Sequence, residues 1–469
     1  MKMENTQQLK AYVRQVLNEA LSQKVPSNSV SNPCPGVFQT VDAALKAAKI
    51  AQHQFEECSL DTRRRVVEAI KRGMTPFVDK IAEDTLRETG MGRLEHKKLK
   101  LKLVLEKTPG VEDLVTEVQT GDQGMVLYEL SPYGVVGAIT PSTNPGETLI
   151  CNAIGMLSAG NSVYFSVHPG AKELSRWIVG KLNEIVYEEI GINNLIVTIE
   201  KPSIEAAQEM MKHPDVALLA VTGGPEVVHQ CLSSGKKAIG AGAGNPPAIV
   251  DETANIEKAA FDIVHGASFD NNILCIAEKS VVAVRDISDF LIFNMEKAGA
   301  FLVKDAAQIE KLRTMTLMEN GNPSRKFIGK DAKFILESAG IPCDYDATII
   351  ILKAEQCHDF VMKEMLMPIL PIVEVDDFEE ALKVAIEIEQ GLHHTATMHS
   401  TNIIRLNKAA RMLKTSIFVK NGSSYAGLGF GGEGTTTFTI ATPTGEGTTT
   451  SRHFARRRRC VLTDGFSIR

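Results

Sequence analysis

Short apolar runs alternate with segments of helical periodicity over most of the chain after residue 134. Strands that are covered by helices on both faces have near-continuous apolar runs, so this alternation predicts parallel sheets with helical crossovers. In a first block we expect strands at 135–140, 162–166, 195–199, 217–221 and 247–250, and helices at 147–158, 172–190, 203–212 and 225–233. In a second block, from 254 to 419, we expect strands near 280–285, 348–353, 369–375, 394–398 and 415–419. The pattern therefore predicts an α/β protein with two parallel-sheet blocks.

The N-terminal region has a different pattern. An isolated amphipathic segment at 5–21 places Leu9, Val13 and Leu17 on one helical face, and a linker containing Pro, Ser and Asn follows at 26–35. The segment is either an ordinary first helix packed on its own domain or a docking peptide. Because the linker separates it from the rest of the chain, we favour a docking peptide.

Two further regions suggest β structure outside the alternating blocks. The stretches 125–130 and 133–140 flank Ser131-Pro132, which predicts two strands joined by a short turn. Residues 430–469 are rich in Gly and Thr and contain the basic run 456–459. We expect this tail to be extended rather than helical.

Size and composition narrow the class of protein. The 469 residues exceed the roughly 250–300 that one core supports, so two or three domains are expected. A formal charge of −6 argues against general affinity for nucleic acid or an anionic membrane. No apolar run approaches the roughly 20 residues needed to span a bilayer, and the first residues lack a signal-peptide core. The eight cysteines include no CxxC pair, so we expect a reducing compartment and no metal site.

Three glycine-rich stretches are candidate ligand-binding loops. Thr222, Gly223 and Gly224 follow an expected strand and open an expected helix, where a phosphate can approach backbone N–H groups. The stretch 240–244 resembles half of a dinucleotide fingerprint, but its third glycine comes one place early and no helix follows. The stretch 427–434 also lacks a following helix and is read as a flexible loop.

Cys275 is the candidate nucleophile. A thiol that attacks a carbonyl must first become a thiolate, and the oxyanion that forms needs hydrogen-bond donors. Asn144, just past an expected strand, offers a side-chain amide, although nothing local links it to Cys275. No carboxylate stands in the stretch 238–244 to activate water, and none lies directly beside Cys275 in the sequence. A second thiol is therefore the favoured acceptor of the acyl group.

Taken together, these motifs resemble the aldehyde dehydrogenase superfamily over nearly the whole chain, and most closely its CoA-acylating branch from bacterial microcompartments. The motifs that carry the resemblance lie at 140–145, 166–172, 222–225, 239–247, 275–279 and 415–422. The tail, at 441–447 and 456–462, resembles that of members that oxidise propionaldehyde in propanediol-utilising compartments. Members that oxidise acetaldehyde during ethanolamine use are close relatives.

The resemblance implies a fold and a division into domains. We expect an aldehyde dehydrogenase-like protein with two Rossmann-like parallel-sheet domains and a β arm for oligomerisation, assembled as a dimer or tetramer. The implied parts are a targeting helix at 1–21, a linker at 22–38, a nucleotide-binding domain at 39–123 and 141–252, a catalytic domain at 253–434, and the arm at 124–140 and 435–469.

The resemblance also assigns roles to residues. Cys275 matches the catalytic thiol, Asn144 the oxyanion-binding amide, and Glu364 the carboxylate that holds the nicotinamide ribose. The implied cofactor-binding residues are Thr140, Pro141, Ser142, Thr143, His168, Pro169, Gly170, Thr222, Gly223, Gly224, Gly240, Ala241 and Glu364.

Three departures from the family pattern bear on the chemistry. Where hydrolytic relatives carry a base glutamate, residues 238–240 are Ala-Ile-Gly, which supports CoA as the acyl acceptor. His168 replaces the lysine of the adenosine-ribose site, and Ala171 replaces its acidic partner, which leaves NAD and NADP both open as cofactor.

The expected enzyme converts a short-chain aldehyde, with propionaldehyde favoured, together with NAD and CoA into acyl-CoA and NADH through a Cys275 thioester. The alternatives are an acetaldehyde-preferring enzyme of the same kind, a hydrolytic aldehyde dehydrogenase, and an idle scaffold component recruited through residues 5–21. The expected location is the lumen of a cytoplasmic bacterial microcompartment, with residues 1–21 bound to a shell protein.

Overall fold

The computed structural model describes residues 34–466. The elements described below all lie in one unit of the chain, residues 35–469. The amphipathic segment at 5–21 and most of the expected linker at 22–38 lie outside the described residues.

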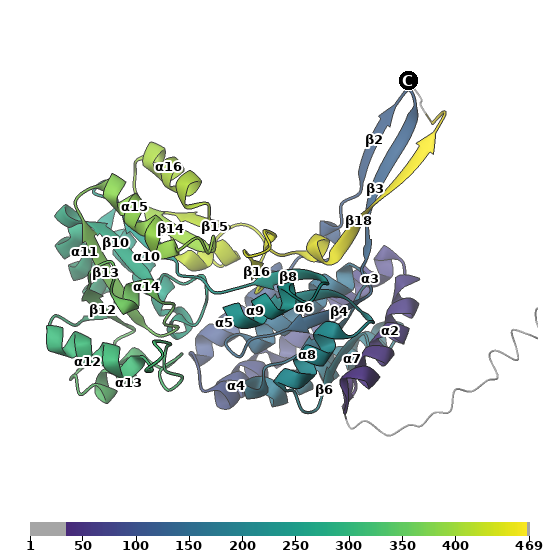
Figure 1. Cartoon of the computed structure of the whole chain (residues 1–469), viewed down its shortest axis with the longest axis horizontal. Helices are drawn as coiled ribbons and strands as arrows, with labels where there is room; N and C mark the ends of the chain where they lie inside the picture. The colour runs from purple at the N-terminus through teal and green to yellow at the C-terminus, as the bar shows by residue number, and fades with distance from the viewer. Residues whose placement is uncertain (1–33, 467–469) are drawn as a thin grey trace, which may run out of the picture. The chain divides into compact units, whose positions relative to one another are not determined.

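The first sheet has six parallel strands in the order β1-β6-β5-β4-β7-β8 (Figure 1). These strands are β1 (Val37–Phe38), β4 (Val135–Ile139), β5 (Ser162–Ser166), β6 (Ile196–Ile199), β7 (Val216–Thr222) and β8 (Lys237–Ala241). The chain leaves β4 toward β5 on one side, and β7 lies on its other side, so the strand order reverses at β4. In open α/β sheets, ligands bind at the carboxyl edge beside such a reversal.

Helices cover both faces of this sheet. On one face the core includes side chains from α3 (Leu60–Met74), α5 (Leu94–Lys107), α6 (Pro145–Ser158) and α7 (Lys172–Ile190). On the other face it includes α2 (Val41–Glu56), α8 (Ile204–Lys212) and α9 (Pro225–Leu232). Every residue of β4, β5 and β6 is buried, which explains their nearly unbroken apolar sequences.

The second sheet has seven parallel strands in the order β11-β12-β13-β10-β9-β14-β15. They are β9 (Pro247–Val250), β10 (Ser280–Val284), β11 (Ala300–Leu302), β12 (Ile349–Lys353), β13 (Ile369–Val375), β14 (Thr395–His399) and β15 (Ile417–Lys420). Its covering helices include α10 (Ile256–Ser268) and α11 (Arg285–Lys297) in one core, and α15 (Phe378–Glu389) and α16 (Ile403–Leu413) in another. The remaining described α-helices are α4 (Val78–Thr89), α12 (Ala306–Thr316), α13 (Ala332–Ser338) and α14 (Asp359–Met362).

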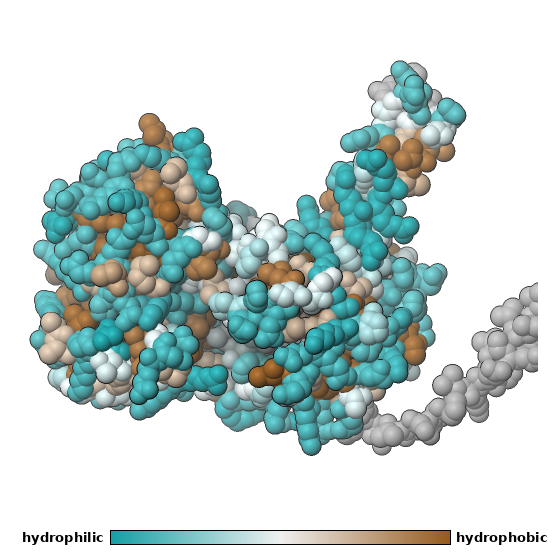
Figure 2. Space-filling model, in the orientation of Figure 1, coloured by the Kyte–Doolittle hydropathy of each residue, from teal (hydrophilic) through white to brown (hydrophobic). Residues whose placement is uncertain are grey.

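A third, antiparallel sheet joins distant parts of the chain. It comprises β2 (Glu117–Gly121), β3 (Gly124–Pro132) and β18 (Ala455–Thr463), with β3 in the centre. After Ala455 every residue of β18 is exposed. Apolar residues are visible toward the end of this sheet in Figure 2, and Val118, Val461 and Leu462 are among its exposed side chains. A short pair, β16 (Ile440–Ala441) and β17 (Gly447–Thr448), precedes β18.

The expected α/β fold with two parallel sheets and a separate β element is confirmed, but several boundaries differ. The hairpin partner of β3 is β2, not the following strand, because Asp122 and Gln123 form a two-residue turn and Gly124 adopts a positive φ of 121°. β4, which we assigned to the arm, lies inside the first sheet. β2, assigned to the nucleotide-binding domain, lies in the antiparallel sheet.

Two more boundaries shift by a few residues. β1 falls within the expected linker yet pairs with β6, and β9, placed at the end of the nucleotide-binding domain, pairs with β10 and β14 of the second sheet. Periodicity marks a strand but does not show which sheet it joins, which is why these assignments failed. Among the described residues, no helix is long and apolar enough to cross a membrane.

Candidate active site

Loops at the carboxyl ends of the first sheet meet the second sheet's nucleophile loop around one cavity of about 460 Å³. β4, β5, β7 and β8 all run in one direction, so the residues after each strand come together at the same edge. The lining includes twelve of the expected site residues: Thr140, Pro141, Ser142, Thr143, Asn144, His168, Pro169, Thr222, Gly223, Gly224, Cys275 and Glu364.

Three expected cofactor-binding residues do not line this cavity. Gly170 donates its N–H to Nδ1 of His168 at 3.0 Å, and the carbonyl of Ala241 accepts from the N–H of Gly223 at 3.2 Å. Gly240 donates its N–H to Thr444 Oγ1 at 3.0 Å. The next two residues, Gly242 and Ala243, line the cavity in their place.

Asn144 stands at the N-cap of α6 but does not cap it. Asparagine at this position normally accepts a hydrogen bond from the first helical turn. Here no such side-chain bond forms, and Oδ1 instead accepts from Nζ of Lys100 at 2.5 Å. Asn144 is 7% exposed and lines the cavity, so its amide is available to a ligand there instead of capping α6.

Cys275 lies at the end of an unusual backbone segment. Asp270, Asn271 and Asn272 have φ values of 49°, 55° and 65°, three successive residues in the left-handed region. Side chains hold this segment in place: Arg93 Nε donates to Asn271 Oδ1 at 2.8 Å, and Asn272 Nδ2 donates to the Ala267 carbonyl at 2.6 Å. Such backbone strain persists only where the surroundings fix it.

The thiol of Cys275 is held in its protonated form. Burial, and next the negative charge of Glu364, raise its pKa to about 12, against opposing effects of Lys279 and of the N–H groups of Cys275 and Ile276. At neutral pH the thiolate is therefore scarce in the protein as described here. A cation placed beside the sulfur would increase the thiolate fraction.

Glu364 is the one carboxylate among the described residues that line the cavity. It comes from the segment between α14 and β13, and its carboxylate accepts from the N–H of Gly244. Burial raises its pKa to about 7, although Lys279 and the Gly244 N–H favour the ionised form. The separation of positions 275 and 364 in the sequence gave no sign that this carboxylate lies near the thiol.

Residues 242–246 connect β8 of the first sheet to β9 of the second and pass beside the nucleophile. A Cβ atom at Gly244 would stand 2.8 Å from the Cys275 carbonyl oxygen and 2.8 Å from the His394 ring. Lys279 donates its backbone N–H to the Pro246 carbonyl at 2.8 Å, which ties the nucleophile loop to this connection. Glycine at 244 is required by this close approach.

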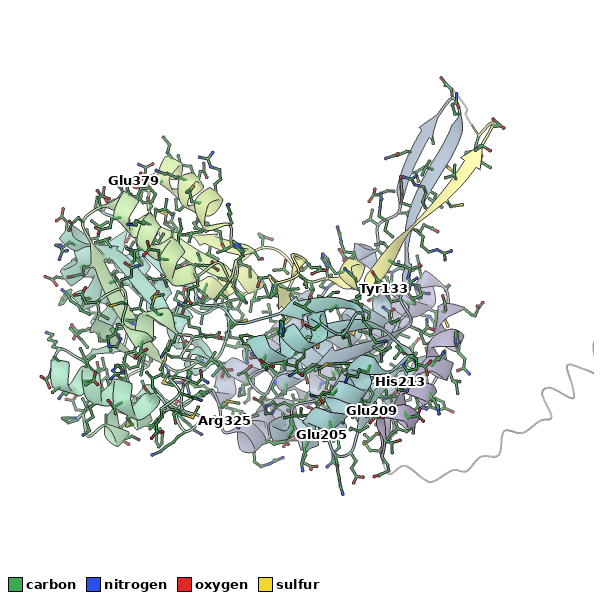
Figure 3. All side chains as sticks on the ribbon, viewed as in Figure 1. Tyr133, Glu205, Glu209, His213, Arg325 and Glu379 are labelled. Atoms are coloured by element: carbon green, nitrogen blue, oxygen red, sulfur yellow. The ribbon has the colours of Figure 1, made fainter. Side chains whose placement is uncertain are left out.

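His168 lies at the exposed edge of the cavity. Its Nδ1 accepts from the Gly170 N–H, which needs an unprotonated nitrogen. Burial, and then the positive charge of Arg325, lower its pKa, so the ring is neutral at pH 7. Arg325, labelled in Figure 3, belongs to the segment between α12 and α13 and brings a cation near this edge.

The cavity has features that suit a phosphate-bearing dinucleotide. The hydroxyl of Thr140 is buried and has no hydrogen-bond partner. The N-terminus of α9, at Gly224, has no side-chain cap, so its N–H groups remain for a ligand. No group of three His, Cys, Asp or Glu residues with metal-binding geometry occurs in the part of the chain that the structure describes.

Sequence reasoning missed the buried charges behind the site. Lys97, Lys100, Glu147 and Asp270 form a cluster next to Asn144 and the nucleophile loop. One signal was available: in the helical pattern at 94–107, both lysines share a face with apolar residues and not with the polar ones.

Comparison with known proteins relates this geometry to characterised enzymes. Residues 36–446 match the aldehyde dehydrogenase family. Propanal dehydrogenase (CoA-propanoylating) of Salmonella typhimurium is 52% identical over 467 residues, which cover 99% of this chain and 100% of the relative.

Two solved structures are similar over most of the chain. Rhodopseudomonas palustris propionaldehyde dehydrogenase with bound CoA and an acylated cysteine has a TM-score of 0.91 at 52% identity, covering 92% of this chain and 99% of that one. A propionaldehyde dehydrogenase from the Clostridium phytofermentans fucose utilisation bacterial microcompartment has a TM-score of 0.91 at 45% identity, covering 93% and 100%.

Proposed function

This chain belongs to the aldehyde dehydrogenase family, and on that premise we propose that it is a CoA-acylating enzyme. It oxidises a short-chain aldehyde, with propanal favoured, using NAD and CoA, and it forms acyl-CoA and NADH. The observation that carries the proposal is the meeting of Cys275, Asn144 and Glu364 around one cavity. The similar enzyme of R. palustris has been observed with CoA and an acylated cysteine.

The chemistry follows from the groups around the cavity. The thiolate of Cys275, formed by loss of the thiol proton, attacks the aldehyde carbon; a C–S bond forms, the C=O π bond breaks, and the carbonyl oxygen becomes an oxyanion. Nδ2 of Asn144 and the N–H of Cys275 stabilise that oxyanion by donating hydrogen bonds. The acyl group then remains on Cys275 as a thioester after the hydride has left.

NAD, when bound, supplies the acceptor for this hydride. The residues that would hold its phosphates and riboses are those at the carboxyl edge of the first sheet, among them Thr222, Gly223 and Gly224. Glu364 would hold the nicotinamide ribose through its carboxylate. Since neither His168 nor Ala171 selects between a free and a phosphorylated ribose, both NAD and NADP should be assayed.

The identity of the acyl acceptor depends on what stands near the thioester. Residues 242–244, which pass next to Cys275, carry no carboxylate that could activate water. Glu364 is the only carboxylate among the described residues that line the cavity, and holding the nicotinamide ribose would occupy it. The thiol of CoA, a better nucleophile than water at neutral pH, therefore takes the acyl group.

The test is an assay of the purified protein with NAD or NADP, with and without CoA, across aldehydes of increasing length. Without CoA we expect a burst of NADH stoichiometric with active sites, followed by slow turnover. Adding CoA should restore steady turnover, and Cys275→Ala should abolish it by several orders of magnitude. Steady release of free acid at the CoA-dependent rate would instead support a hydrolytic enzyme, and preference for acetaldehyde over propanal would support the acetaldehyde-specific alternative.

We also propose that the enzyme works inside a bacterial microcompartment, with residues 1–21 bound to a shell protein. The amphipathic sequence at 5–21 and the C. phytofermentans relative from such a compartment support this proposal. A homo-oligomer built through the β2-β3-β18 sheet would cover its exposed Val118, Val461 and Leu462. Light scattering of the purified protein tests the dimer or tetramer.

A further inference from the structure

Four ionisable side chains are buried together directly behind the cavity. Lys97, Lys100, Glu147 and Asp270 are each no more than 2% exposed. The Lys100 ammonium lies 2.6 Å from Asp270 Oδ2 and 2.9 Å from Glu147 Oε1, and Lys97 lies 3.3 Å from Asp270 Oδ2. Two cations face two carboxylates, so the cluster is neutral as a whole. Buried charges are rarely kept without a role, because they must be fully paired to be tolerated.

The third partner of Lys100 is Asn144. An ammonium can donate hydrogen bonds but not accept them, and here it donates to Oδ1 of Asn144 while it forms ion pairs with Asp270 and Glu147. Because Lys100 can only donate, the amide atom that faces it must be the oxygen. The amide nitrogen of Asn144 is thereby directed away from Lys100, where its other contact is a long one, 3.4 Å to Thr143 Oγ1.

Lys100 also contacts the segment that carries the nucleophile. Asp270 is the first of the three left-handed residues before Cys275, and its backbone N–H donates to His96 Nδ1 at 2.8 Å. Its Oδ1 accepts from the backbone N–H of Arg93 at 2.7 Å. One ammonium on α5 thus bonds both to the amide at the start of α6 and to the loop that ends in Cys275.

From these contacts we propose that Lys100 is a positioning residue for the oxyanion site of the reaction. It fixes Asn144 with Nδ2 toward the cavity and polarises the amide so that Nδ2 donates more strongly. Lys100 itself does not touch the substrate. The inference rests on the proposed aldehyde oxidation through Cys275.

Burial disfavours the charge on Lys100, yet Asp270 and Glu147 hold its pKa above the ordinary value. The pKa of Lys97 is lowered, by burial and then by the charge of Lys100. Burial acts against ionisation of Asp270, but the two lysines bring its pKa below the ordinary value. Lys100 therefore remains a cation, and the amide orientation persists, across the pH range in which an NAD-dependent enzyme is assayed.

The first experiment compares Lys100→Met with Lys97→Met in the full-length enzyme. Both variants remove one cation from the same helix and the same carboxylate, but only Lys100 contacts Asn144. Losing an oxyanion donor costs about 10²–10³-fold in kcat, so a misoriented amide should cost K100M at least roughly tenfold in CoA-dependent acyl-CoA formation. K97M should retain most of its kcat.

A double-mutant cycle separates orientation from general damage. If Lys100 acts through Asn144, then adding Lys100→Met to Asn144→Ala should cause no further loss of kcat. Alkylation of Cys275 by iodoacetamide gives a second readout, because displacement of iodide at a saturated carbon forms no oxyanion. The alkylation rate should be the same in K100M and the wild type, while the acylation rate falls.

Because K100M leaves a buried carboxylate without its cation, the variant can fail to fold. Lys100→Met combined with Glu147→Gln keeps the cluster neutral, and Glu147→Gln alone is its reference. Unchanged acylation in this folded pair would overturn the inference, as would an equal loss in alkylation or a full additional loss in the Asn144→Ala background. A wild-type enzyme without CoA-dependent turnover would overturn the proposed function instead, so the two failures can be told apart.

Discussion

Glu364 and Cys275 are coupled through charge, which makes the reactivity of the thiol adjustable from a neighbouring position. The carboxylate contributes to raising the Cys275 pKa to about 12, second only to burial. Glu364→Gln should therefore lower the thiol pKa and speed alkylation by iodoacetamide at pH 8 in the absence of cofactor.

The same substitution should weaken cofactor binding, because an amide is a poorer acceptor for ribose hydroxyls than a carboxylate. KM for NAD should rise in Glu364→Gln while KM for the aldehyde changes little. Slower alkylation in this variant would show that its carboxylate does not act on the thiol through charge.

Glu278 gives a prediction about stability. It is fully buried and accepts from the N–H and Oγ of Ser424 at 2.8 and 2.7 Å, yet burial raises its pKa to about 7. Between pH 4.5 and 7 the folded protein keeps a proton that the unfolded chain has released. The free energy of unfolding should thus fall as pH rises through this window and level off above it.

Glu278→Gln should remove this dependence, which amounts to roughly 3 kcal/mol for a shift of this size. Urea unfolding at pH 5 and pH 8 measures it. Glu364, with a pKa of about 7, adds a slope of the same sign, and His394 and His399, with pKa values of about 4, add one of opposite sign, so the measured quantity is the difference in slope between the variant and the wild type. An unchanged slope would mean that Glu278 titrates normally.

At the scale of single residues, the sequence indicated which side chains could take part in catalysis. It did not show which of these side chains lie close together in the folded protein. Cys275 and Asn144 were singled out by residue type, but their pairing came from the family resemblance, since no spacing rule connects the end of β4 to a loop before β10. Lys100 escaped notice because a lysine among leucines reads as a solvated helix position. The apolar residues on the same helical face, such as Leu101 and Val104, were the one available signal that this position faces inward.

At the scale of elements, the connection between β8 and β9 decides where a catalytic carboxylate can be introduced. The sequence pointed to 238–240 as the place where the family's base is missing, but Ala238 packs against the apolar core of the first sheet. Ala243 lines the cavity.

Ala243→Glu should therefore increase release of free acid in the absence of CoA, whereas Ala238→Glu should not. A well-placed general base contributes about 10²–10⁴-fold, and a grafted side chain without supporting contacts should reach about tenfold. Product analysis after the NADH burst distinguishes acid from retained thioester. Equal hydrolysis in both variants would mean that neither glutamate acts on the thioester.

The elements themselves were mostly predictable. Strands β5, β9 and β13 begin and end where their apolar runs do, because each is buried on both faces. The partner of β3 was predicted wrongly, because Ser131-Pro132 was interpreted as the hairpin turn. The actual turn, at Asp122-Gln123, was overlooked. Its long-range partner β18, more than 300 positions away, leaves no local signal.

For the whole molecule, we expect residues 1–21 to act in targeting to a compartment and not in catalysis. Deleting them should leave the kinetics nearly intact, because every residue lining the cavity lies between 139 and 440. Co-expression with shell proteins should then show the truncated enzyme outside the compartments. A truncated enzyme that still enters shells would disprove targeting by this segment, and a loss of folding would favour an ordinary packed helix.

The α/β class and the presence of two parallel sheets followed from the alternating apolar runs. Their boundaries did not, because β4 and β9 are each next in the chain to a segment of a different sheet. A strand's sheet is decided by packing partners far away in the sequence, and a periodicity of hydrophobic positions contains no information about them.

The raised pKa of Cys275 has a consequence for survival of the protein. Cysteine sulfur is attacked by reactive carbonyls and by oxidants chiefly as the thiolate. Because burial and Glu364 keep the Cys275 sulfur protonated, the thiol is protected from oxidation in the resting enzyme, and the positive charge of bound oxidised nicotinamide would reduce this protection. Without cofactor, the enzyme should therefore lose activity slowly in peroxide. The rate of inactivation should increase with the fraction of enzyme that has oxidised cofactor bound.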